Sequence, residues 1–181
     1  MVLRADAQRN LERVLDAATE AFAASGPDVS VDEIAQRAGV GHATVFRRFP
    51  TKDSLIAAVV ERRVAEILEL AVQAVVAADP GKAFFDFAWQ VTELQASSRG
   101  LSRCFAECDK VPAKRDVERL AAKIVARAQK AGAVRDDIEP ADALELIRAA
   151  LLSAPEQQWR RYVEVVLDGL RAPSAKPPAR G

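Results

Sequence analysis

Several features that mark whole classes of protein are scarce in this sequence or missing from it. Its 181 residues include two cysteines, too few for the disulfide framework of a small secreted domain. The sequence has no apolar N-terminal run of the signal-peptide type. No stretch approaches the ~18 uninterrupted apolar residues that span a bilayer. We therefore expect a soluble, cytoplasmic protein with no membrane partner.

The residue patterns of catalytic sites are missing as well. The chain has one histidine and contains no glycine-rich phosphate loop, no His-Glu-x-x-His motif and no nucleophile elbow. Carboxylates clustered in a catalytic layout are absent too. The sequence therefore predicts that the protein is not an enzyme and that it needs neither a cofactor nor a metal ion.

The two cysteines, Cys104 and Cys108, lie four residues apart and so share one face of a predicted helix. This spacing would suit a metal or redox sensor. No third or fourth metal ligand is nearby in the sequence, and the one histidine lies in a distant segment. Buried cysteine is common as a small hydrophobic residue, and we favour that interpretation.

Glycine and aromatic residues are also few, whereas Ala, Leu, Val, Glu and Arg dominate, a composition typical of an all-α protein. Apolar residues recur at helical spacing along most of the chain. Glycine and proline interrupt this pattern at intervals. We expect about nine helices and no strand, with helices over residues 6–25, 30–38, 42–48, 52–78, 82–98, 101–109, 113–131, 140–152 and 153–171.

Charge is balanced overall but unevenly distributed. Lysine and arginine together number 26, the same as aspartate and glutamate. From Ile34 to Lys52 there is no acidic residue, whereas Arg37, Arg47 and Arg48 all lie in this window. A local basic patch of this kind is compatible with nucleic-acid binding despite the net charge of zero.

The segment SVDEIAQRAGVGHATVFRRF, residues 30–49, has what two short crossing helices require. Ser30 can cap the first helix, with Glu33 at the reciprocal position of a capping box. Ala35 is small where the second helix crosses, and Gly39 can adopt the positive φ of a tight turn. Val45 is placed to return into the shared core. This spacing predicts a helix-turn-helix.

The segment GVGHATVFRRFPTKDSLIAAVV, residues 39–60, resembles the recognition helix, turn and following helix of the TetR family of transcriptional regulators. Residues 9–18 fit the family register, and Val166–Leu170 resembles a recurring family ending. The resemblance implies a DNA-binding domain over residues 1–50, a helical effector-binding and dimerisation domain over 51–172, and a disordered tail over 173–181.

The same resemblance implies a function. It predicts a sequence-specific repressor that binds a palindromic double-stranded DNA operator as a homodimer and is released by a small, hydrophobic ligand. The helix over residues 42–48 would lie in the major groove. Phe46 stands where the family commonly has a phosphate-contacting tyrosine, so that hydrogen bond is not available. The predicted DNA-binding residues are Ser30, His42, Ala43, Thr44, Phe46, Arg47, Arg48 and Lys52.

Two functions are expected of the C-terminal part. Apolar stripes on the last two helices would form a four-helix dimer interface, or would close the core of a single chain. The predicted interface residues are Leu144, Ile147, Leu151, Trp159, Tyr162, Val163, Val166 and Leu170.

Aromatic and apolar residues would line an effector pocket between helices, or would simply be core. The predicted lining is Phe84, Phe87, Trp89, Val91, Phe105 and Cys108.

Two other functions compete with a DNA-binding regulator. An enzyme is disfavoured because catalytic motifs are missing from the sequence. A helical protein-interaction or ligand-carrier module that has lost DNA binding is weakly favoured by Phe46 alone. Salt-dependent binding to duplex DNA separates these alternatives.

Overall fold

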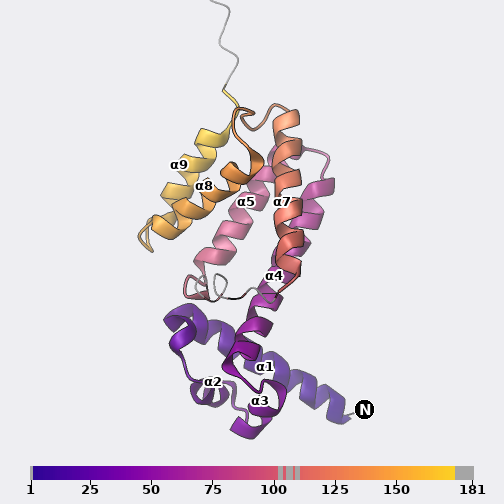
Figure 1. The fold of residues 1–181 in the computed structure, drawn as a ribbon, viewed down its shortest axis with the longest axis vertical. Coiled ribbons are helices and arrows are strands. Elements are labelled where there is room, and N and C mark those ends of the chain that lie inside the picture. Colours follow the sequence, from indigo (N-terminus) through magenta and orange to yellow (C-terminus); the bar gives the residue numbers. More distant parts are fainter. Residues whose placement is uncertain (1, 102–103, 105–107, 109–110, 174–181) are drawn as a thin grey trace, which may run out of the picture. The chain divides into compact units, whose positions relative to one another are not determined.

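The computed structural model describes residues 2–101, 104, 108 and 111–173, and within them it confirms an all-α fold without a β-strand (Figure 1). One isolated β-bridge joins Val134 to Arg171. The predicted helix over residues 101–109 lies mostly outside the described residues. The helices are α1 (Val2–Ser25), a 3-10 turn η1 (Gly26–Asp28), α2 (Val31–Ala38), α3 (His42–Arg48), α4 (Lys52–Val76), α5 (Pro80–Ala96), α7 (Ala113–Lys130), α8 (Pro140–Ser153) and α9 (Trp159–Leu170).

Most helix boundaries lie within a few residues of those expected, and the largest discrepancy is the start of α9. The sequence pattern predicts a start near Ser153, but α9 begins at Trp159. The intervening residues form turns, in which the N–H of Gln158 donates to the carbonyl oxygen of Pro155 at 2.8 Å. Proline lacks an N–H and restricts the residue before it, so the chain turns here instead of continuing as a helix.

The chain divides into two compact units. The first unit comprises Met1–Glu66 with Ser97–Lys114, and the second comprises Ile67–Ala96 with Arg115–Gly181. The division falls within α4, which is therefore shared by both units. The segment that follows α5 belongs with the N-terminal helices, a grouping that no sequence pattern indicated.

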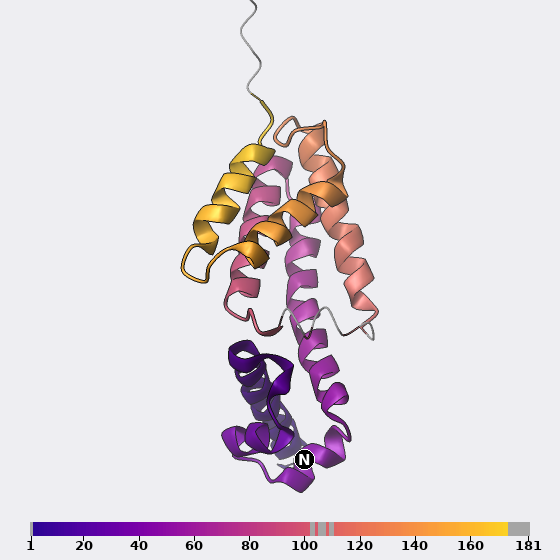
Figure 2. The same ribbon diagram turned by 60° about the vertical axis from the view of Figure 1, so that its left-hand side comes forward.

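The first unit is built around α1, α2 and α3 (Figure 2). Phe22 of α1, Ile34 of α2 and Val45 of α3 are almost completely buried. Gly39 ends α2 with a φ of +61°, and the N–H of Val40 donates to the carbonyl oxygen of Ala35 at 3.1 Å. This left-handed turn confirms the role that the sequence predicts for Gly39.

The start of α2 is only half of the capping box that the sequence predicts. Ser30 Oγ accepts a hydrogen bond from the backbone N–H of Glu33 at 3.1 Å, as expected. The Glu33 carboxylate does not complete the box but accepts from Arg37 Nη2 at 2.6 Å. The charged Arg37, one turn along the helix, thus competes successfully with the backbone N–H of Ser30 for the Glu33 carboxylate.

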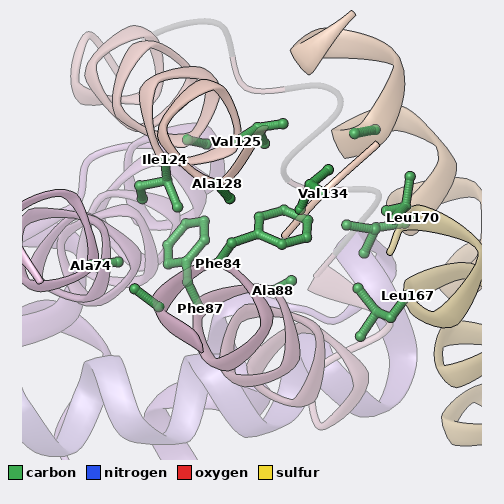
Figure 3. Close-up of a cluster of buried hydrophobic side chains, with 14 of the residues drawn as sticks. Ala74, Phe84, Phe87, Ala88, Ile124, Val125, Ala128, Val134, Leu167 and Leu170 are labelled. Carbon is green, nitrogen blue, oxygen red and sulfur yellow. The ribbon is translucent and has the colours of Figure 1, made fainter. Parts of the chain in front are cut away.

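The second unit encloses an apolar core formed by α5, α7, α8, α9 and the C-terminal part of α4. Figure 3 shows Phe84 and Phe87 of α5 beside Ile124, Val125 and Ala128 of α7, and all five side chains are buried. Arg127 caps the C-terminal end of α4. Its guanidinium donates to the carbonyl oxygens of Ala74, Val75 and Ala77. The last carbonyls of a helix have few partners within it, although that of Ala74 also accepts from the N–H of Ala77 at 3.3 Å. A positive charge is favoured at this C-terminal end of the helix dipole.

Replacement of two glycines by serine, one at a time, tests the backbone geometry of the turn between α2 and α3. Gly39→Ser should lower the free energy of unfolding by about 1 kcal/mol, because an L-residue is strained at a φ of +61°. Gly41→Ser is the matched control, since Gly41 has a φ of −63° at the N-cap of α3 and open space around its Cα. Serine is favoured at this position, so stability should be unchanged or higher. Urea denaturation gives both values, and equal losses would contradict the strain argument.

Candidate DNA-binding surface

Helix α3 has a buried face and an exposed face. Val45 and the adjoining Phe49 are buried, so they anchor this short helix to the rest of the first unit. The residues pointing away from this core are exposed, while Thr44 is half-buried. The exposed residues of α3 are His42, Ala43, Phe46, Arg47 and Arg48, all from the predicted DNA-binding set.

The first turn of α3 is tied to α2 by a polar contact. The Nδ1 atom of His42 contacts the carboxylate of Asp32, close to the start of α2. The imidazole also stacks on the ring of Phe46, with the ring centroids 4.3 Å apart and the ring planes inclined by 22°. The exposed side of α3 therefore presents an ordered aromatic pair beside its arginines.

The basic residues of the window from Ile34 to Lys52 are not equivalent. Arg37 is paired with Glu33 at 2.6 Å, so its charge is locally balanced. Within the described part of the chain, no ion pair involves Arg47, Arg48 or Lys52. The cations of α3 are thus available to a polyanion, whereas Arg37 is less so.

The remaining two predicted DNA-binding residues lie at helix starts. Ser30 is exposed, and its hydroxyl accepts from the backbone of α2. Lys52 is half-buried at the start of α4, next to a cap in which Thr51 Oγ1 accepts from the N–H of Ser54 at 3.1 Å. Lys52 therefore lies at the capped start of a helix.

The predicted effector-pocket residues are distributed between the two units. Phe84 and Phe87 are buried in the core of the second unit, and Trp89 and Val91 pack against that core. Cys108 is buried in the first unit, and Phe105 lies outside the described residues. The described structure thus brings four of the six residues into one hydrophobic cluster and does not group Cys108 with them.

The predicted interface residues lie on both sides of α8 and α9. Ile147, Leu151, Val163 and Leu170 are buried within the core of their own chain. Leu144, Trp159 and Val166 are partly buried against that core, and the Trp159 ring lies 5.9 Å from that of Trp89. Of the predicted set, Tyr162 is the exposed member.

Sequence periodicity missed the outward-facing apolar residues of these two helices. Leu146 and Leu152 of α8 and Val165 of α9 are exposed, and Val165 is 65% exposed. With Tyr162 and Val166, some of them line a shallow groove between α8 and α9. Their signal in the sequence was an apolar residue directly beside a member of the core stripe, as in the pairs Leu146–Ile147, Leu151–Leu152 and Val165–Val166.

Comparison with known protein families identifies the class to which this fold belongs. Residues 14–59 match the family model described as bacterial regulatory proteins of the tetR family. Residues 79–172 match the model described as the C-terminal domain of SbtR-like transcriptional regulators. Together these matches include the helix-turn-helix and most of the second unit. The chain belongs to the TetR family of transcriptional regulators.

Individual relatives support this membership. A crystal structure of a TetR transcription regulatory protein from Mycobacterium vanbaalenii is 41% identical, with a TM-score of 0.67 over 93% of this chain and 99% of the other. A transcriptional repressor of Mycobacterium tuberculosis is 49% identical over 49 residues, which are 26% of each chain. A gamma-butyrolactone receptor shares the fold, with 17% identity and a TM-score of 0.68 over 90% of this chain and 97% of the other.

No helix in the described part of the chain combines the length and the apolar character that crossing a membrane requires. The described residues also contain no group of three or more side chains suited to hold a metal ion. Cys104 and Cys108 are both buried, and no disulfide joins them.

Replacement of one exposed arginine tests whether α3 contacts DNA. Arg47→Ala should weaken binding to the operator by about 1–3 kcal/mol, because Arg47 has no ion-pair partner in the described chain and lies on the exposed face. Arg119→Ala removes the same charge from α7, where Arg119 pairs with Asp116 at 3.0 Å, and should leave binding unchanged. Fluorescence anisotropy with labelled duplex measures both, and equal affinities for Arg47→Ala and the unaltered protein would show that this side chain does not contact DNA.

Proposed function

We propose that this protein is a homodimeric repressor that binds a palindromic operator through α3 and leaves it when a small hydrophobic effector binds. The observation that carries the proposal is the exposed face of α3, which holds two arginines without ion-pair partners in the described chain. Such a helix fits the major groove of B-DNA, and its charges would displace counterions from phosphates.

The experiment that tests DNA binding is a gel shift with the DNA upstream of the protein's own coding region. We expect binding that resists non-specific competitor and weakens steeply between two salt concentrations. The absence of binding to this DNA and to a random duplex pool would contradict the proposal.

The exposed apolar face of α8 and α9 supports homodimer formation. Leu146, Tyr162 and Val165 lie around the groove between these helices. Two copies of this surface facing each other across a two-fold axis would form a four-helix interface and remove it from water. Dimerisation also explains a palindromic operator, because each half-site would be read by one copy of α3.

Control by an effector requires a connection between the second unit and α3. The two recognition helices must lie about 34–36 Å apart, or a multiple of that, to enter successive major grooves. Helix α4 is shared by both units, so a tilt of α4 would change this separation. An effector that binds the altered spacing better would shift the population away from DNA.

The segment that follows α5 provides a second connection from the second unit to the helices of the first. Ser98 Oγ accepts from Arg63 Nη2 of α4 at 2.8 Å, and the N–H of Gly100 donates to the carbonyl oxygen of Ala23 in α1 at 3.1 Å. A Cβ atom on Gly100 would lie 2.2 Å from the carbonyl oxygen of Phe22, so only glycine fits this closely. Movement at the end of α5 would therefore be transmitted to α1.

The chemical class of the effector is suggested by the second unit. Phe84, Phe87, Trp89 and Val91 make one end of its core aromatic and apolar, which suits a hydrophobic compound. A protein with the same fold is a receptor for a gamma-butyrolactone. This supports a small-molecule effector without specifying its structure.

A charge at the proposed interface tests dimer formation. Val165→Glu should dissociate the dimer, because burial of a carboxylate at this surface costs on the order of several kcal/mol, which an ion pair with the nearby Arg161 would only partly offset. Val76→Glu is the matched control, since Val76 is 76% exposed at the end of α4, outside this face. Analytical ultracentrifugation measures both. A dimer that persists in Val165→Glu would exclude this surface as the interface.

Linkage provides the test of effector control. Any compound that stabilises the protein in a thermal-shift screen of hydrophobic ligands should weaken operator binding. Operator DNA should then weaken binding of the compound by the same factor, because coupling between two binding sites is reciprocal. Anisotropy titrations with and without the compound provide this factor, and simultaneous binding without mutual weakening would contradict the mechanism.

A further inference from the structure

Phe46 occupies an unusual position in the first unit. It is 39% exposed, and no other described side chain of this unit is a large hydrophobic residue with comparable exposure. Its neighbours on the core side of α3, Val45 and Phe49, are buried. The core therefore does not require the Phe46 ring, and the ring is available to a partner of the exposed face.

The Phe46 ring is held in place from one side. The imidazole of His42 stacks on it at 4.3 Å between centroids, and Nδ1 of His42 is bound by the carboxylate of Asp32. Stacking covers one face of the phenyl ring and leaves its other face and its edge available. Because Asp32 belongs to α2, the orientation of the pair depends on both helices of the helix-turn-helix.

The side chains of α3 restrict which bases it can read. The helix His42–Arg48 contains no Asn or Gln, the residues that bind adenine with two hydrogen bonds in the major groove. It also contains no Asp or Glu, which accept from the amino group of cytosine. Arg47 suits guanine, and Thr44 is half-buried. An A·T pair still has one other feature that α3 could recognise, the 5-methyl group of thymine, which makes apolar contacts.

We infer that Phe46 reads an A·T pair in each half-site through the 5-methyl group of thymine, with His42 as the residue that positions the ring. The inference rests on the DNA-binding function proposed above and specifies the chemistry of its operator. Each half-site then combines a guanine contacted by Arg47 with a thymine contacted by Phe46.

Replacement of thymine by uracil tests this contact, because it removes the methyl group and keeps every hydrogen-bonding atom. The probe is a duplex that the full-length protein enriches from a random 30-bp pool, with thymines replaced one at a time and then in symmetric pairs. Each half-site should contain one thymine whose replacement weakens binding about fourfold. This factor corresponds to the free energy of burying one methyl group. The symmetric pair should weaken binding about fifteenfold.

Variants at Phe46 and His42 identify the group responsible. Phe46→Ala should abolish the difference between thymine and uracil, whereas Phe46→Leu, the matched control that retains an apolar side chain, should keep most of it. His42→Ala should reduce the ratio of the affinities for thymine and uracil duplexes. His42→Phe should restore part of this ratio, because it keeps the ring stack but loses the contact with Asp32. Circular dichroism melts confirm that each variant folds.

Three results would overturn the inference. One is that no thymine is sensitive to the loss of its methyl group. Another is that Phe46→Ala weakens binding equally for thymine and uracil probes, which would assign Phe46 to the sugar-phosphate backbone. In both cases the proposed DNA-binding function remains intact. A failure to enrich any duplex contradicts that function itself, and the inference with it.

Discussion

The left-handed turn at Gly39 is the constraint on which the DNA-facing geometry depends. With a φ of +61°, it ends α2 and redirects the chain so that α3 crosses within a few residues. This crossing lets Val45 enter the same core as Ile34 and Ala35. It also brings Asp32 of α2 into contact with His42 of α3. The orientation of every exposed side chain on α3 follows from that one backbone conformation.

The division of the molecule does not follow the order of the chain. Helix α4 is shared by both units, and residues 97–114 belong with the N-terminal helices although they follow α5. Hydrogen bonds from Arg63 and Gly100, and the close approach of Gly100 to α1, hold that segment in place. The first unit is thus connected to the second through α4 and through the end of α5. Through either connection, the proposed effector control could act on the first unit.

Apolar residues serve two purposes in the last two helices. One set, which includes Leu151 and Val163, closes the core of the chain, while Leu146 and Val165 face outward beside Tyr162. Helices α8 and α9 also pack against each other and against α5. The outward apolar residues of these two helices are not buried within the single chain. They form the surface on which the proposed dimer would assemble.

By itself, the sequence determined the helical fold, the helix-turn-helix and its exposed residues, because these depend on local signals. The cap at Ser30, the turn at Gly39 and the period of apolar residues act over a few positions. Only the tertiary structure decided which apolar stripe of α8 and α9 faces inward, because periodicity gives a face but not its partner. It also decided that the Glu33 carboxylate pairs with Arg37, that Cys108 belongs to the first unit whereas Phe84 and Phe87 belong to the second, and that the rings of His42 and Phe46 stack. Each of these depends on contacts between side chains whose competition only the folded chain resolves.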